Sequence, residues 1–260
     1  RDCPYRTPGC YNMAMATHDS GARWKTFLSE AKEQEITLLL SGQTASPVID
    51  VSFHELTGFD PEFAEDILIS PRLIISSGHK TLSEICRDRG VDLDAMIRLS
   101  DLPKDTMRPL REIGSRDIDK LRSLDVIVTK MSQLKPRIHI AVFQCETCGE
   151  TQQIDQTNES ELVEPIRCPP DTGCGASIRG TDSTRFNLVM NISRMINNQW
   201  LEIQELPENV PSGAQPSRAQ VLLEGDLVNK HLPGQRITAN VIPVVRSEIK
   251  KNKKTPMFDI

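Results

Sequence analysis

The sequence predicts an α+β protein with several subdomains: an N-terminal helical bundle, an OB-fold β-barrel that carries an inserted zinc-ribbon-like module, and a long basic β-hairpin. Three observations predict it. Apolar residues recur with a helical period in the first third of the chain, and from about residue 107 they alternate with period two. Four of the seven cysteines fall inside thirty residues.

The helical bundle is expected over residues 16–106. Apolar residues of 24–31 follow the i, i+3, i+4, i+7 spacing of one helix face. The run "DPE" at 60–62 offers an N-cap, a proline at the first helical position and an acid in the first turn. That helix should end at "SP", residues 70–71, and "SSGHKT" should be a loop before the next helix, which ends at Gly90.

The OB barrel is expected to occupy residues 107–144 and 181–260, with the basic hairpin at about 244–260 and the insert at 145–180. Residues 48–53 should form a short separate strand. Alternating, β-branched segments predict the barrel strands at 124–131, 137–145, 199–206, 219–228 and 235–245.

Residues 1–15 are polar and irregular, and they are expected to be a disordered leader, either an added segment or sequence upstream of the natural start. No stretch approaches eighteen consecutive apolar residues, and no signal-peptide core is present at the start. We therefore expect no membrane span and an intracellular protein. The net charge of −5 argues weakly against nucleic-acid binding, but it can hide local patches.

The cysteine cluster predicts a structural zinc site. Two residues separate Cys145 from Cys148, five residues separate Cys168 from Cys174, and a glycine follows the second cysteine of each pair. Thiolate pairs on tight turns supply four ligands to a tetrahedral zinc and leave no position for water. The alternatives are four free cysteines, two disulfides, or His139 as a substitute ligand. The insert is acidic, which suits protein contacts better than phosphate contacts.

Catalytic motifs are not found in the sequence. The run "SSGHKT" at 76–81 lacks the glycine spacing of a phosphate-binding P-loop, and no nucleophile or metalloprotease motif is present. The acids around residues 60–66 are read as a solvated helix face. We therefore expect no active site in this stretch of chain.

The most basic run lies near the end of the chain. The run contains one acidic residue, Glu248, and five basic residues: Arg246, Lys250, Lys251, Lys253 and Lys254. A strand precedes the run and "MFDI" resembles a returning strand, so a hairpin with its tip at 251–253 is expected. Lysines at such a tip could bind phosphates with salt-dependent affinity, whereas the alternative is a solvated tail.

Three stretches resemble the N-terminal region of archaeal minichromosome maintenance (MCM) replicative helicases. "SPVIDVSFHELTGFDPEFAEDILISP" (46–71) is similar to the helical subdomain. Residues 111–150 resemble the entry into the barrel and the first zinc knuckle. Residues 200–244, with "EGDLV" and "PGQRIT", are the most similar. The five-residue spacing of the second cysteine pair and the leader depart from the family pattern.

The resemblance implies a ring-shaped homohexamer around single- or double-stranded DNA, with other replication-fork proteins as partners and a cytoplasmic, nucleoid-associated location. The basic hairpin would point into the central channel, and the zinc ribbon would join two hexamers head to head. Lys130, Arg137 and Arg185 are weaker candidates for DNA contacts. The loop at 206–219 would signal to an ATPase module, through residues that include Glu208, Gln215 and Arg218. ATP and Mg²⁺ would bind only in that module, which lies beyond residue 260.

Two other functions remain open from the sequence. The chain could be a zinc-ribbon and OB module that binds protein in a transcription or translation assembly, with no role on DNA. Less favoured is an enzyme with an unrecognised acidic site. Binding to DNA separates the first reading from the second.

Overall fold

The computed structural model describes residues 8–44, 46–156, 162–178, 183–250 and 253–259, with side chains described from residue 19 to 245. Two compact units make up the chain. The first contains 1–130, 202–221 and 233–260, and the second contains 131–201 and 222–232. In the described part of the chain, no helix is long and apolar enough to cross a membrane.

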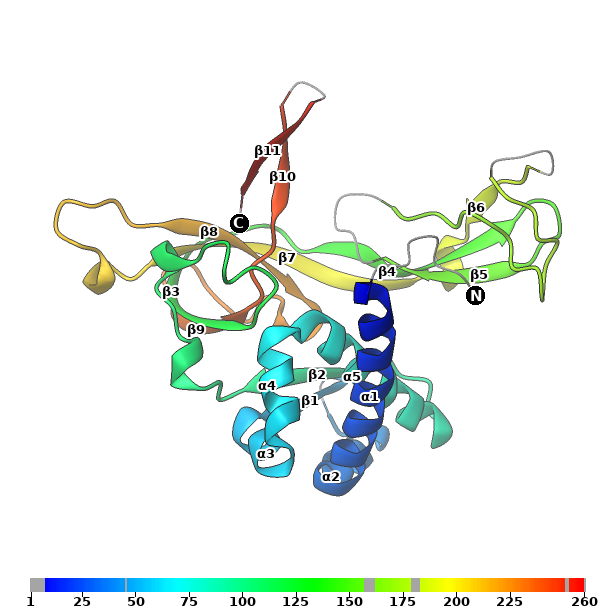
Figure 1. The fold of residues 1–260 in the computed structure, drawn as a ribbon, viewed down its shortest axis with the longest axis horizontal. Coiled ribbons are helices and arrows are strands. Elements are labelled where there is room, and N and C mark those ends of the chain that lie inside the picture. Colours follow the sequence, from blue (N-terminus) through cyan, green and yellow to red (C-terminus); the bar gives the residue numbers. More distant parts are fainter. Residues whose placement is uncertain (1–7, 45, 157–161, 179–182, 251–252, 260) are drawn as a thin grey trace. The chain divides into compact units, whose positions relative to one another are not determined.

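Five α-helices build the N-terminal part of the first unit (Figure 1). They are α1 (Pro8–Ala31), α2 (Glu33–Leu40), α3 (Phe53–Phe59), α4 (Pro61–Ile69) and α5 (Pro71–Asp88). Helix α1 includes residues 8–15 of the expected leader, and residues 1–7 lie outside the described ones.

Local sequence chemistry sets the starts of the short helices. Ser52 and Glu55 form a capping box at α3. The Ser52 hydroxyl accepts from the His54 amide at 3.3 Å, and the Glu55 carboxylate accepts from the Ser52 amide at 3.2 Å. Asp60 caps α4 by accepting from the Phe63 amide at 3.1 Å, and Pro61 occupies the first turn, as predicted. The proline at Pro71, expected only to end α4, also begins α5.

The aromatic residues form the centre of the helical core. Trp24 packs edge-to-face on Phe27 and Phe63, and its indole N–H donates to the carbonyl of Ile74 at 2.8 Å. The sequence "SSGHKT" lies inside α5, so the prediction of a loop there is wrong. A Cβ on Gly78 would lie 2.8 Å from the Trp24 ring, which explains the glycine as a close packing contact.

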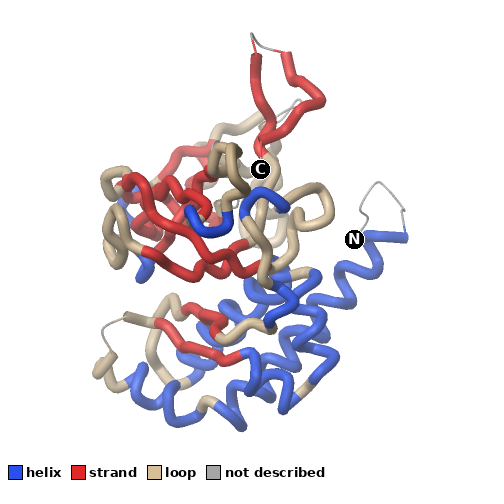
Figure 2. Tube along the Cα trace, turned by 90° about the vertical axis from the view of Figure 1, so that its left-hand side faces the viewer, coloured by secondary structure: helices blue, strands red, loops and turns tan. Residues whose placement is uncertain are grey.

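A short parallel pair of strands lies among the helices (Figure 2). Strand β1 (Val48–Ser52), predicted from its sequence, pairs with β2 (Met96–Ser100). Strand β2 was not predicted. Ile49, Val51 and Ile97 are buried in the helical core, so this pair is part of the same hydrophobic cluster.

The remaining strands form an OB-type sheet of seven strands in the order β5-β4-β7-β3-β9, with β6 on β4 and β8 on β7. The path among the described strands is open, so the sheet is OB-type but does not close into the β-barrel that the sequence predicted. The strands are β3 (Arg122–Met131), β4 (Lys135–Cys145), β5 (Thr151–Asp155), β6 (Phe186–Leu188), β7 (Arg194–Glu205), β8 (Arg218–Glu224) and β9 (Arg236–Val241).

In the first unit, hydrogen bonds and apolar contacts join the helices to the sheet. The Leu121 amide donates to the carbonyl of Leu68 at 3.1 Å, and the Asn240 side chain donates to the carbonyl of Leu99 at 3.0 Å. Leu121 and Ile242 also pack against the helical core. The strand pair β3–β9 is therefore attached to the helices by hydrogen bonds and apolar contacts.

A two-stranded antiparallel hairpin follows β9. Strand β10 (Arg246–Lys250) pairs with β11 (Lys253–Asp259), with a register shift between Ser247 and Ile249. The sequence predicted a hairpin here. Residues 251–252, at the expected tip, lie outside the described residues.

Candidate metal centre and basic surfaces

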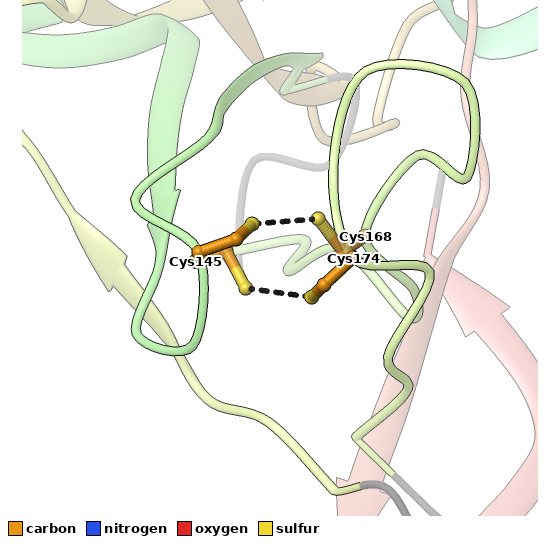
Figure 3. A group of neighbouring side chains, drawn as sticks. Cys145, Cys168 and Cys174 are labelled. Atoms are coloured by element: carbon orange, nitrogen blue, oxygen red, sulfur yellow. Dashed lines mark hydrogen bonds between the residues drawn. The ribbon is translucent and has the colours of Figure 1, made fainter.

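Four cysteine sulfurs meet in the second unit (Figure 3). Cys145 ends β4, Cys148 lies in the turn that follows, and Cys168 and Cys174 come from the later part of the insert. All four Sγ atoms lie within 4.8 Å of one another. Cys145 and Cys168 are buried, whereas Cys148 and Cys174 are exposed, so one edge of the group faces solvent.

The sulfur spacings fit a tetrahedral metal. Cys145 and Cys174 are 3.7 Å apart at Sγ, and Cys148 and Cys168 are 3.6 Å apart. A zinc ion with four thiolates at about 2.3 Å requires sulfur–sulfur edges of about 3.8 Å. These distances are too long for disulfides, whose sulfurs lie about 2.05 Å apart. The residues present therefore fit a tetrahedral metal ion.

Glycines shape both cysteine turns. Gly149 and Gly175 have φ of 75° and 68°, a left-handed backbone that glycine adopts without steric cost. The Gly149 amide donates to the carbonyl of Cys145 at 2.9 Å, which closes the first turn. In the second, the Gly173 amide donates to the carbonyl of Pro169 at 2.9 Å, and this extra turn accommodates the five-residue spacing.

The cysteines have unequal pKa values. A hydrogen bond from the Thr184 hydroxyl, helped by the amides of Cys148 and Thr147, lowers the pKa of Cys145 to about 6. Burial and the neighbouring Cys148 thiol raise the pKa of Cys168 to about 12. Two adjacent thiolates repel each other, and a divalent cation among them would remove that repulsion.

His139, the alternative ligand, is not part of the group. It lies in β4 at a register shift against β7, and its carbonyl accepts from the Gln156 amide at 2.8 Å. The candidate metal ligands among the described residues are the four cysteines.

The basic run occupies both strands of the hairpin. Lys250 pairs with Lys253, Ile249 with Lys254, and Arg246 with Asp259. Lys251 lies outside the described residues. The register therefore brings basic positions of both strands next to the turn, although their side chains are not described.

The weaker basic candidates differ in exposure and in their partners. Lys130 is 72% exposed and pairs with Glu202 at 3.2 Å, and Arg218 reaches the same carboxylate at 3.5 Å. Arg137 is mostly buried and pairs with Glu224, so this carboxylate within the second unit neutralises much of its charge. Arg185 is exposed beside the cysteine turns, where its carbonyl accepts from the Glu146 amide at 3.0 Å.

The expected signalling loop begins after β7 and ends at β8. Glu208 pairs with Arg236, Gln215 is exposed, and Arg218 donates to Gln204 at 3.0 Å. The structure does not bring these three side chains together.

Sequence reasoning missed the ion pair that closes the loop. Glu205, 1% exposed, accepts two hydrogen bonds from Arg111, and its amide donates to the carbonyl of Ser217 at 3.0 Å. The two residues are 94 positions apart, and no local pattern indicates the pair.

Comparison with known proteins identifies the family. The model of the MCM OB domain matches residues 109–246, more than half of the chain. The DNA replication licensing factor mcm4-A of Xenopus laevis is 25% identical over 204 residues, which cover 77% of this chain and 22% of that protein. The minichromosome maintenance protein MCM of Saccharolobus solfataricus is 27% identical over 224 residues, covering 81% and 30%.

The fold is also found in a solved structure. The 1.8 Å crystal structure of the N-terminal domain of an archaeal MCM has a TM-score of 0.81 and 28% sequence identity, and the match covers 94% of this chain and 95% of that one. The chain spans less than a third of the length of the Xenopus laevis and Saccharolobus solfataricus relatives. The chain therefore belongs to the MCM family and corresponds to its N-terminal region.

Proposed function

We propose that this chain is the DNA-binding, hexamer-forming N-terminal collar of an ATP-dependent replicative DNA helicase. The match to the N-terminal domain of an archaeal MCM over 94% of the chain carries the proposal. The helicase activity would belong to the longer protein, with ATP and Mg²⁺ bound in an ATPase module beyond this stretch of chain. Residues 16–106 would serve as the helical subdomain, and residues 145–180 as the zinc ribbon.

The hairpin would supply the main DNA contact. Basic positions on both strands beside the turn, Lys250, Lys253 and Lys254, support this role. The same run of the sequence also contains Lys251. Each lysine that neutralises a phosphate releases a condensed counterion, so the affinity would depend steeply on salt and little on base sequence. In a ring, the basic charge of several copies would be concentrated in one channel while the rest of each chain stays acidic.

Exposed basic side chains on the sheet would add smaller contributions. Lys130 and Arg218 share the carboxylate of Glu202, which reduces their net charge. Arg137 is mostly buried and forms an ion pair with Glu224, so we expect it to contribute less to DNA binding than Lys130. Arg185 lies beside the cysteine centre and would contact DNA only if that module does.

The cysteine centre would hold one structural zinc ion. Cys145, Cys148, Cys168 and Cys174 would be its ligands, and four thiolates leave no open position for catalysis. The metal would fix the two turns of the insert, whose acidic surface suits contact with protein. The proposed contact is with a second hexamer.

DNA binding by the 260-residue chain tests the proposal. Binding to single- and double-stranded oligonucleotides is measured by fluorescence anisotropy over a range of salt concentrations. For duplex DNA, the logarithm of affinity falls with the logarithm of salt by about 0.9 for each neutralised phosphate. Replacing Lys250, Lys251, Lys253 and Lys254 by Ala is expected to abolish most of the binding and to flatten the salt slope.

A charge-matched variant is the control. It replaces four exposed basic residues outside the hairpin, Lys25, Arg87, Lys104 and Arg116, by Ala. The control should keep nearly the wild-type affinity. Equal losses in both variants would show that net charge alone causes the binding. No binding by the wild-type chain, together with capture of a protein partner, would favour a protein-interaction module.

A further inference from the structure

Thr184 links the two cysteine turns from outside the group of sulfurs. It is 6% exposed, and its amide donates to the carbonyl of Ser177 at 2.9 Å, which attaches it to the segment after Cys174. The Oγ1 atom of its side chain lies 3.3 Å from the Sγ of Cys145. One buried threonine therefore contacts both halves of the candidate metal centre.

Thr147 orients the Thr184 hydroxyl. The Thr147 hydroxyl donates to Thr184 Oγ1 at 2.8 Å, so Thr184 acts as acceptor in that bond and keeps its own proton to donate. Two acceptors lie within reach: the Cys145 sulfur at 3.3 Å and the Arg185 carbonyl at 3.4 Å. The first distance is ordinary for a bond to sulfur, whereas the second is long for O–H···O. The proton is therefore directed at the sulfur.

The hydrogen bond from Thr184 is made to Cys145, which is one of the two buried cysteines of the group. Cys145 and Cys168 are buried and Cys148 and Cys174 are exposed, so water and chelators reach the second pair first. A hydroxyl that donates to a thiolate stabilises its negative charge and restricts its rotamer. Cys145 would then stay bound while the exposed ligands exchange.

We propose that Thr184, oriented by Thr147, is a positioning residue of the metal centre, whose hydroxyl holds the Cys145 thiolate in place for the metal and slows release of the ion. The inference rests on the proposed zinc site. Outer-shell partners of metal ligands commonly change metal affinity by about 10- to 100-fold when they are removed.

Metal exchange in single-site variants tests the role. The chain is loaded with Co²⁺, whose thiolate charge-transfer and ligand-field bands report the number and geometry of bound sulfurs, and release to a chelator is followed by absorbance. Thr184→Val keeps the side-chain shape and removes the hydroxyl. We expect metal release about 10-fold faster or more, with shifted charge-transfer bands. Thr184→Ser should restore the wild-type release rate and the wild-type charge-transfer bands. Thr147→Val should give a release rate between those of the wild type and Thr184→Val.

Thr172→Val is the matched control, because Thr172 is an exposed residue of the second cysteine loop. It should release Co²⁺ at the wild-type rate. The inference fails if Thr184→Val retains wild-type release and spectrum, or if Thr184→Ser is as fast as Thr184→Val, because packing would then be the cause. If Thr184→Val does not fold, an unchanged release rate in Thr147→Val overturns the inference. A wild-type chain that binds no metal would instead refute the zinc site itself.

Discussion

Arg111 donates two hydrogen bonds to the carboxylate of Glu205, at 2.7 Å from Nε and 2.6 Å from Nη2. Arg111 lies in the short 3₁₀ helix at Leu110–Glu112, which precedes β3, and Glu205 is the last residue of β7. The planar guanidinium matches a carboxylate in this two-bond geometry, which lysine cannot reproduce. The pair therefore fastens the base of the loop at 206–217 to the segment that follows the helices.

Replacing Arg111 by Leu should destabilise the first unit, because it leaves the buried carboxylate of Glu205 without its cation. We expect a fall of several degrees in Tm. Arg111→Lys should recover only part of the loss. The double variant Arg111→Leu with Glu205→Leu should be more stable than Arg111→Leu alone. Thermal unfolding followed by circular dichroism measures all three, and an unchanged Tm in Arg111→Leu would contradict the assigned role.

Acid should weaken the same contact. The hydrogen bonds from Arg111 lower the pKa of Glu205 below its ordinary value of 4.5. A carboxylate with a lowered folded-state pKa contributes stability that is complete above the unfolded value and is lost as pH falls through the folded one. The difference in urea midpoint between the wild type and Glu205→Gln should therefore be largest near pH 7 and shrink below about pH 4.5. A difference that grows with acid would refute this sign.

Gly78 should not tolerate a methyl group. Its Cβ would lie 2.8 Å from the ring of Trp24 and 2.9 Å from Ile97. Overpacking costs about 1–3 kcal/mol, against which alanine gains about 1 kcal/mol in helix propensity. We expect Gly78→Ala to lower the free energy of unfolding by up to about 2 kcal/mol.

Gly58→Ala is the matched control in α3, since nothing lies within 4 Å of its Cβ position. It should raise stability by up to about 1 kcal/mol. Urea unfolding compares the two variants. Equal changes in the free energy of unfolding of the two variants would mean that helix propensity alone determines the effect and that the contact with Trp24 does not contribute.

Gly173 should be required by the cysteine centre. A Cβ there would lie 2.4 Å from the Cys168 sulfur, closer than any real contact, and 3.1 Å from the Pro169 carbonyl. Gly173→Ala should therefore reduce bound zinc well below one ion per chain, whereas Thr172→Ala, next to it, should not. Metal analysis by mass spectrometry after dialysis measures both. Full zinc content in Gly173→Ala would contradict the geometry.

Local signals in the sequence predicted the parts of the fold that depend on neighbouring residues. Asp60 with Pro61 starts α4 as expected. The glycine after each cysteine pair marks a turn in which Gly149 and Gly175 have a left-handed backbone. The alternating segments correspond to β3, β4, β7, β8 and β9. Each of these features depends on a cap, a turn residue or a period that a short window contains.

Long-range packing explains what the sequence did not predict. Gly78 resembled a loop glycine, and only its contact with Trp24, 54 positions earlier, accounts for it inside a helix. Strand β2 pairs with β1 across the helices α3, α4 and α5, and Thr184 reaches Cys145 from 39 positions away. The open path of the sheet likewise depends on which strands pair, and period-two alternation does not encode pairing.

The number of chains on DNA tests the central claim most directly. Native mass spectrometry of the wild-type 29.1-kDa chain with a DNA oligonucleotide counts the copies in each complex. A collar around DNA predicts six chains per DNA molecule, or twelve where two hexamers join, and loss of these species when the four hairpin lysines are replaced by Ala. A single chain per DNA, or six chains whose DNA binding survives that replacement, would contradict the account.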